Sequence, residues 1–465
     1  MSTARRLPPN DASRRGWCPS LARPMPTGDG LLARVHPPLG ILTAAQLRAV
    51  AEAARLYGNG HIDITARGNL QIRGVSEGTA CALAAHLTEA GLGDVRSDGG
   101  PQRLTLTSPL AGHDPDALID AIALARAVEA MGLTIAGLSA KMLVAVESGG
   151  RWGLGEAEAD LLIRPIAPSC VAIGLASETA HHWCPEVDVA NAPQAIGRVL
   201  VAFVASEHRR MRDLDDTRRS SIAAIASGHV DGRADRQAPF PPPCGEGQRV
   251  GVVPLAAIGT SGTTPSSNSS PQGGGEPRSA MPPGFVRLGA DLAAIVAEAP
   301  FGRCTADGLD AAAAIAGDKG VRCTPERGLV LLASPPRAEA ILRSLNAAGF
   351  ITDPADPRRA IAACPGAPAC ASGSTPVPEH AAHLAEAFAP FAARGLTAHV
   401  SGCAKGCAHP RPADLTLVAE DGLYRVVIDG APGETGQPPS LTFEAALDRV
   451  RRADPARSLA GAFSS

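Results

Sequence analysis

An internal duplication limits the possible folds of this sequence more than any other feature. Six short segments of the first half recur in the same order in the second half, at nearly one offset of about 258 residues. The matching pairs are 38–43 with 300–305, 62–65 with 321–324, 90–91 with 348–349, 103–109 with 359–365, 137–141 with 395–399 and 160–161 with 414–415. The sequence therefore predicts two tandem copies of one structural unit.

Each copy begins with an alternation of strand and helix patterns. In the first copy, residues 31–35 form an apolar run, and Thr43 precedes an amphipathic helix with the spacing of a capping box. Alternating apolar residues at 62–64 and 70–72 predict two strands around a turn, and a second helix pattern ends near Gly91. The order β-α-β-β-α is that of a ferredoxin-like half-domain.

The predicted fold class is α+β, with a ferredoxin-like half-domain and a larger α/β half-domain in each copy. A Pro-, Ser- and Gly-rich stretch between the copies lacks apolar periodicity and is predicted to be flexible. The expected boundaries are an N-terminal arm at 1–26, ferredoxin-like half-domains at 27–95 and 285–352, α/β half-domains at 96–237 and 353–465, and the flexible insertion at 238–284.

Overall charge excludes two classes of partner. The chain has 43 Lys and Arg against 46 Asp and Glu, a net charge of -3, so neither nucleic acid nor a membrane surface is expected to bind it. No run of apolar residues is long enough to span a bilayer, and Arg14-Arg15 is not followed by the apolar core of an export signal. We expect a cytoplasmic protein.

Four cysteines of the second copy carry the clearest chemical signal. Cys364 and Cys370 follow a C-x5-C pattern in a loop rich in Gly, Pro and Ala, and Cys403 and Cys407 follow a C-x3-C pattern. Two such pairs can close a four-thiolate cage, and we predict that they hold one 4Fe-4S cluster. Structural zinc is an alternative, although C-x5-C is wide for a zinc pair. Four unrelated buried thiols are the second alternative.

With this cysteine pattern and the duplication, the sequence resembles the nitrite and sulfite reductase family over nearly the whole chain, apart from the first arm and the insertion. The resemblance implies a 4Fe-4S cluster beside a tetrapyrrole bound between the two copies. It also implies that Arg67, in Thr-Ala-Arg-Gly-Asn, Arg103, before Thr-Ser-Pro, and Lys141, in Leu-Ser-Ala-Lys, hold anionic groups. Arg73 and Lys405 are further candidates, because a polycarboxylate ligand needs several cations.

Two departures from the reductase pattern point to one branch of this family. Leu143 stands where the reductases have a second lysine, and the last cysteine pair reads Cys403-Ala-Lys-Gly-Cys407. Together with Thr-Gly-Asp-Gly-Leu-Leu-Ala-Arg at 27–34, these features resemble the branch in which the tetrapyrrole is a substrate, precorrin-3A, of aerobic cobalamin biosynthesis.

The resemblance to this branch implies hydroxylation of precorrin-3A by dioxygen with closure of a lactone, using the cluster and a non-haem iron. The ligands of that iron are unassigned; His399 and His409 are candidates, and a structural role is the alternative for each. No G-x-G-x-x-G follows a strand pattern, so electrons should come from a separate NADH-dependent donor.

Two other functions remain open at this stage. A sirohaem-dependent sulfite or nitrite reductase would use the same fold and cluster. A tetrapyrrole-binding or electron-transfer module would have no chemistry of its own.

Overall fold

The computed structural model describes residues 17–155, 157–226, 280–435 and 437–463. Most of the predicted N-terminal arm and of the insertion at 238–284 therefore lies outside the described residues, as does Cys244. The described ends of both segments are folded. Leu21 is part of the largest apolar core, and Met281 is buried against strands of the second copy.

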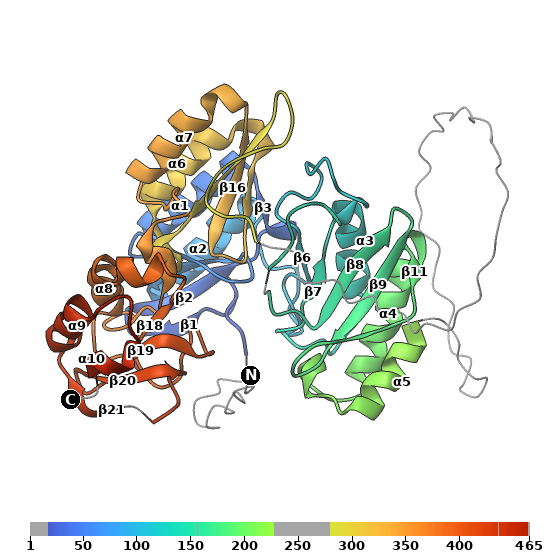
Figure 1. The fold of residues 1–465 in the computed structure, drawn as a ribbon. Helices are drawn as coiled ribbons and strands as arrows, with labels where there is room; N and C mark the ends of the chain where they lie inside the picture. Colours follow the sequence, from blue (N-terminus) through green and yellow to red (C-terminus); the bar gives the residue numbers. More distant parts are fainter. Residues whose placement is uncertain (1–16, 156, 227–279, 436, 464–465) are drawn as a thin grey trace.

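Two five-stranded antiparallel sheets form the centre of the molecule, and each one receives its fifth strand from the other copy (Figure 1). The first sheet has the order β1 (Met25–Thr27), β2 (Gly30–Val35), β5 (Leu70–Val75), β4 (His61–Ile64) and β14 (Arg303–Thr305). The second has the order β12 (Gly284–Arg287), β13 (Ala293–Glu298), β16 (Gly328–Ala333), β15 (Val321–Cys323) and β3 (Ile41–Leu42).

The exchanged strands explain why 38–43 matches 300–305 in sequence. Both segments begin with a short 3-10 turn in which one residue has a positive φ, 53° at Leu39 and 56° at Phe301. The chain then crosses to the opposite sheet, where Cys304 pairs with Ile62, and Leu42 pairs with Val321. The duplication predicted from sequence is confirmed, and the exchange makes the two copies interdependent.

Helices cover these sheets and join them into one core. They are α1 (Ala44–Tyr57), α2 (Glu77–Glu89), α6 (Ala306–Ala316) and α7 (Ala338–Ala347). The predicted capping box is present at α1, where the Thr43 hydroxyl accepts the Gln46 amide at 3.1 Å and the Gln46 side chain accepts the Thr43 amide at 3.0 Å. One apolar cluster contains buried residues of both ferredoxin-like halves, so they form a single unit.

Each α/β half-domain has its own core and the same mixed strand pairing, which again confirms the duplication. Three strands are parallel and the next is antiparallel, in β6-β7-β8-β9 and in β17-β18-β19-β20. The first half has β6 (Thr105–Thr107), β7 (Val144–Val146), β8 (Leu161–Ala167), β9 (Cys170–Ala176), β10 (His181–Trp183), β11 (Val187–Asp188), α3 (Ala121–Leu133), α4 (Ala192–Val204) and α5 (Asp216–Ala226). The second has β17 (Ile361–Ala363), β18 (Ala398–Ser401), β19 (Ala413–Glu420), β20 (Leu423–Gly430), β21 (Gln437–Leu441), α8 (Val377–Ala392), α9 (Phe443–Arg452) and α10 (Ala460–Phe463).

The domain boundaries expected from the sequence stay a prediction. β1 begins at Met25, inside the predicted arm, because Met25–Thr27 forms a hairpin with β2. In the part of the chain that the structure describes, no helix is both long and apolar enough to cross a bilayer.

Candidate functional site

The four predicted cluster cysteines lie together on one wall of a cleft of about 2750 Å³. Cys364 directly follows β17, and Cys403 follows β18, so the parallel pairing of these strands brings both cysteine loops to one sheet edge. The Cys370 amide donates to the Gly366 carbonyl at 2.6 Å, which curls the first loop back on itself. Two cysteine pairs with thirty-two residues between them are thereby joined into one site.

The residues around the cysteines fit a bulky sulfur cluster. The amide of Gly402 donates to the Cys364 sulfur at 3.2 Å, and a Cβ at Gly402 would lie 3.2 Å from the same atom. Amide hydrogen bonds to sulfur are typical of iron–sulfur sites. Burial is the main cause that raises the pKa of Cys364, and Cys370 and Cys403 raise it further. Hydrogen bonds from the backbone of Gly402 and Gly366 lower it. The thiols are therefore close enough to interact.

The cysteines do not form the compact cage of a single metal ion. Within the described ranges, no group of three or more His, Cys, Asp or Glu side chains is placed to hold one ion. This geometry does not favour the zinc alternative, because zinc needs four ligands within about 2.3 Å. A four-iron cluster binds its thiolates at separate corners and requires a wider arrangement.

The same finding bears on the non-haem iron, for which the described residues offer no ligand set. His399 is fully buried and neither of its ring nitrogens has a hydrogen-bond partner. Burial, followed by His409 and Arg327, lowers the pKa of His399 to about 3. The ring of His409 packs edge-on against it at 5.9 Å.

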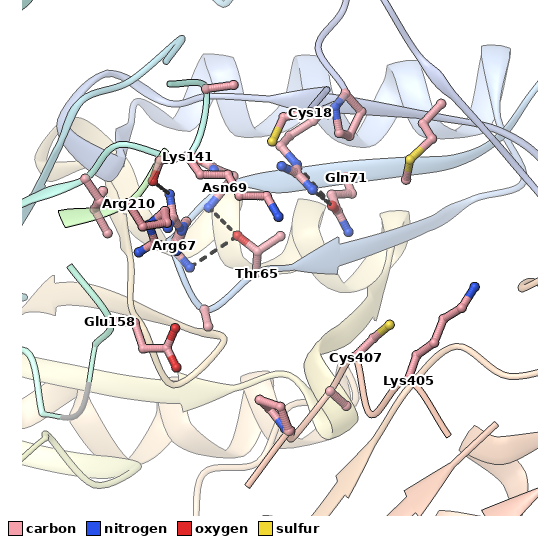
Figure 2. A pocket seen from close by; sticks show the side chains of 18 of the residues that line it. Cys18, Thr65, Arg67, Asn69, Gln71, Lys141, Glu158, Arg210, Lys405 and Cys407 are labelled. Carbon is pink, nitrogen blue, oxygen red and sulfur yellow. Dashed lines mark hydrogen bonds between the residues drawn. The ribbon is translucent and has the colours of Figure 1, made fainter. Parts of the chain in front are cut away.

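Cations outnumber acids around the cleft, in contrast to the chain as a whole. The described Lys and Arg side chains that line it number fourteen, against seven Asp and Glu. Figure 2 shows Arg67, Lys141 and Arg210 gathered on one side, with Lys405 and Cys407 across the cleft. The cleft therefore has a cationic wall facing a cysteine wall, which suits an anionic ligand large enough to touch both.

Arg67 and Lys141 both lie on the cationic wall, and their contact with an anionic ligand stays a prediction. The Arg67 guanidinium donates to the backbone carbonyl of Lys141 at 2.8 Å, so the tip of the turn after β4 contacts the segment before β7. Burial, followed by the charge of Arg210, lowers the pKa of Arg67 to about 10. Lys141 is exposed, and its ammonium group has no ion pair among the described residues. Both charges are available to a ligand.

Arg103 lines the cleft but uses its guanidinium on backbone carbonyls. It donates to Pro37 at 3.2 Å, to Gly68 at 3.0 Å and to the carbonyl of Arg67. The side chain is 7 % exposed. Its geometry thus fixes the turn that carries Arg67, and the direct anion contact expected for Arg103 remains a prediction.

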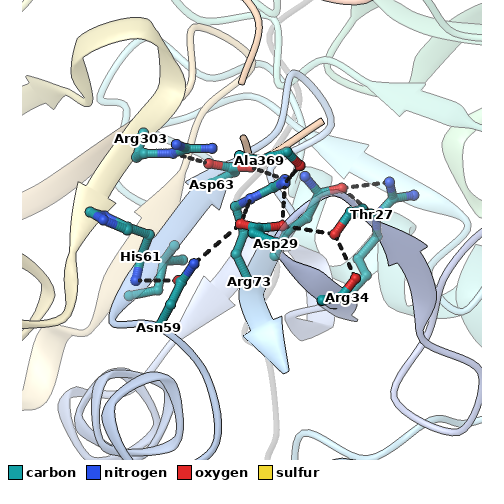
Figure 3. Close-up of polar contacts among 12 residues, drawn as sticks. Thr27, Asp29, Arg34, Asn59, His61, Asp63, Arg73, Arg303 and Ala369 are labelled. Carbon is teal, nitrogen blue, oxygen red and sulfur yellow. Dashed lines mark hydrogen bonds and ion pairs between the residues drawn. The ribbon is translucent and has the colours of Figure 1, made fainter. Parts of the chain in front are cut away.

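Arg73 is likewise occupied by the protein. It forms ion pairs with Asp29 and Asp63, at 2.9 and 3.1 Å, and donates to the carbonyl of Ala369 in the first cysteine loop (Figure 3). Its charge is neutralised, which makes it a structural link instead of a ligand contact. Lys405 lies in the second cysteine loop and reaches Ser372 at 3.2 Å.

Sequence reasoning missed two parts of the cleft. Cys18, which no sequence motif marks as part of the site, lines it (Figure 2) and interacts with Arg34. A basic segment at 208–212, between α4 and α5, also lines it. The sequence of this segment, His-Arg-Arg-Met-Arg, is basic, but no neighbouring residue pattern indicates that it faces the same cleft as Arg67.

The first copy contains a counterpart of the cluster loop without its sulfur ligands. The amide of Ser148 donates to the Ser108 hydroxyl at 3.0 Å, as the amide of Gly402 donates to the Cys364 sulfur. Ser108 occupies the sequence position that matches Cys364, and Asp114 the position that matches Cys370. The copies therefore share a backbone arrangement, and only the second has the thiols for a cluster.

Comparisons with known proteins agree with this architecture. Residues 23–90 match the nitrite/sulfite reductase ferredoxin-like half domain. The NirA protein of Mycobacterium tuberculosis has a similar structure, with a TM-score of 0.62 and 20% identity over 93% of this chain and 83% of that chain. Ferredoxin–nitrite reductase from Leptolyngbya laminosa is 39% identical over 119 residues, which is 25% of this chain and 23% of that protein. The fold is that of the nitrite and sulfite reductases.

A relative that covers nearly the whole chain narrows this class. Precorrin-3B synthase from a Sinorhizobium species is 33% identical over 453 residues, 94% of this chain and 88% of the relative. The chain belongs to the precorrin-3B synthase family.

Proposed function

We propose that this protein catalyses the oxygen-dependent conversion of precorrin-3A to precorrin-3B, a hydroxylation with closure of a lactone. The observation that carries the proposal is the single cleft in which four cysteines face a wall of arginine and lysine. Family membership supports it, because the precorrin-3B synthase relative matches both copies of the unit, whereas the nitrite reductase match covers a quarter of the chain.

In this proposal Cys364, Cys370, Cys403 and Cys407 hold a 4Fe-4S cluster, which supplies single electrons when bound. Arg67 and Lys141 bind carboxylates of the substrate, because they carry the accessible charges on the cationic wall. Arg103 positions Arg67 by donating a hydrogen bond to the backbone carbonyl of Arg67. Hydroxylation takes one atom of dioxygen and releases the other as water, so it consumes two electrons and two protons; a separate NADH-dependent donor supplies the electrons.

Product analysis tests the proposal. Anaerobically purified protein is incubated with precorrin-3A, dioxygen and a chemical reductant, and the product is examined by mass spectrometry with 18O-labelled dioxygen. A product carrying one labelled oxygen and a lactone supports the function. A purified protein that retains sirohaem bands, reduces sulfite or nitrite and leaves precorrin-3A unchanged would identify a reductase instead.

A further inference from the structure

A short arginine-rich segment, His208 to Arg212, lies on the cationic wall of the cleft; we name it the arginine loop. It follows α4 and enters a 3-10 turn at Met211. Its four basic side chains all line the cleft, and Met211 is buried underneath. The loop therefore has an apolar anchor facing the protein and charges facing the cavity.

Asp160 fixes this loop relative to the predicted anion site. One of its carboxylate oxygens accepts hydrogen bonds from Arg210 Nε and from the Met211 amide, both at 2.9 Å. The other oxygen accepts the Leu143 amide at 3.1 Å. Asp160 is fully buried, so its three hydrogen bonds are costly to lose. The arginine loop and the segment that carries Lys141 are thus held as one rigid wall.

The loop brings more positive charge than the protein neutralises. Arg210 is paired with Asp160 at 2.9 Å, and Arg212 with Glu158 at 3.2 Å. Arg209 is exposed and has no ion pair or hydrogen bond within the described part of the chain, although it lines the cleft. Lys141 is also unpaired there, and Arg67 donates only to a neutral carbonyl.

Crowding of these cations is unfavourable unless an anion lies between them. Arg210 is close enough to Arg67 for its charge to disfavour a second cation there, and Asp160 can offset only part of this repulsion. A carboxylate that bridges two guanidinium groups would relieve it, because each planar group can donate two parallel hydrogen bonds.

We propose that Arg209, together with Arg67 and Lys141, forms a carboxylate subsite for one acidic side chain of the tetrapyrrole substrate. The subsite is distinct from the cysteine wall, since Figure 2 shows Arg67 and Lys141 across the cleft from Cys407. It holds the edge of the macrocycle that lies farther from the cluster and so fixes which edge faces the cysteines. This inference rests on the proposed function, because it assumes a polycarboxylate tetrapyrrole.

Binding of a stable probe tests the subsite without turnover. Uroporphyrin III, an octacarboxylate porphyrin, is titrated into cluster-containing wild-type protein and into Arg209→Ala, Arg209→Lys and Arg218→Ala variants, and fluorescence gives Kd at several salt concentrations. Arg218 is a matched control, because it is an exposed arginine of α5 that does not line the cleft.

We expect Arg209→Ala to raise Kd roughly tenfold, as expected for loss of one hydrogen-bonded charge, and to weaken the salt dependence. Arg209→Lys should restore part of the affinity, and Arg218→Ala should match the wild type. Equal affinity of wild type and Arg209→Ala would overturn the subsite alone. Failure of the wild-type protein to bind any tetrapyrrole carboxylate would overturn both the subsite and the proposed function.

Discussion

The guanidinium of Arg73 in the first copy donates a hydrogen bond to the carbonyl of Ala369, inside the cysteine loop of the second copy (Figure 3). Asp29 and Asp63 orient the arginine from the opposite side. The amide of Gly28 also donates to Ala369, at 3.2 Å, and a Cβ at Gly28 would lie 2.0 Å from the Pro368 carbonyl oxygen. The first copy therefore supports the loop that the second copy uses for the cluster.

Replacing Arg73 by Met should lower the free energy of unfolding by about 3 kcal/mol, because the mostly buried carboxylate of Asp29 loses its ion-pair partner and that of Asp63 keeps only Arg303. The cysteine loop should also loosen, and the iron content should fall. Chemical unfolding and iron analysis measure both effects. Arg55→Met serves as the control, since its ion pairs with Asp307 and Asp310 are exposed and worth at most about 1 kcal/mol. A fully loaded, equally stable Arg73 variant would contradict the supporting role.

Each of the four cysteines should be needed for the cluster. Single Cys→Ser variants at 364, 370, 403 and 407 are expected to lose iron and sulfide and the broad visible absorbance of the holoprotein, because a hydroxyl is a poor ligand for iron in such clusters. Cys81→Ser provides the comparison, as Cys81 is exposed on α2 and does not line the cleft. Any variant of the four with a full iron and sulfide complement would remove that residue from the ligand set.

The Ser108 counterpart of the cluster site predicts a pair of contrasting variants. Ser108→Ala leaves the buried Ser148 amide without its acceptor and should lower the free energy of unfolding by about 1 to 3 kcal/mol. Ser108→Cys should be much better tolerated, because a sulfur accepts the equivalent amide at Cys364. Iron content should stay constant in both. Equal free energies of unfolding for the two variants would show that this hydrogen bond does not stabilise the fold.

Lys141→Met should weaken binding of precorrin-3A by about 1.5 to 3 kcal/mol, because a hydrogen bond to a charged group is lost. The cluster spectrum should remain, since Lys141 lies across the cleft from Cys407 (Figure 2). Lys319→Met, at an exposed lysine outside the cleft, is the control for loss of charge. Titration with precorrin-3A, followed by visible absorbance, gives the affinity of each protein. Equal affinities of the wild type and Lys141→Met would exclude Lys141 from the binding site.

Stability should decrease with rising pH around neutrality because of Glu326. Burial raises the pKa of this carboxyl from 4.5 to about 7. The folded state therefore holds a proton that the unfolded state releases, and this contribution is complete below about pH 4.5 and lost as the pH rises through about 7. Urea midpoints of wild type and Glu326→Gln between pH 5 and 8 measure it. The difference between the urea midpoints of the two proteins should vary with pH. A difference that stays constant would argue against a raised pKa of Glu326.

Much of the fold could be predicted from the sequence, because its signals are local or repeated. The capping box of Thr43 and Gln46 acts within one helical turn, and the cysteine spacings define ligand pairs within single loops. The duplication was visible as a repeated order of short motifs, and it predicted that the two halves share one architecture. These features depend on neighbours within a few residues and on comparison of the chain with itself.

Only the tertiary structure decided how the charges are used. Arg67, Arg73 and Arg103 look alike in the sequence, yet Arg73 is neutralised by two aspartates, and Arg103 is committed to carbonyls. The exchange of β3 and β14 and the link from Asp160 to Arg210 join residues from distant segments. The physical reason is that the availability of a charge depends on the groups within a few ångströms of it, and here those groups come from parts of the chain that meet only after folding.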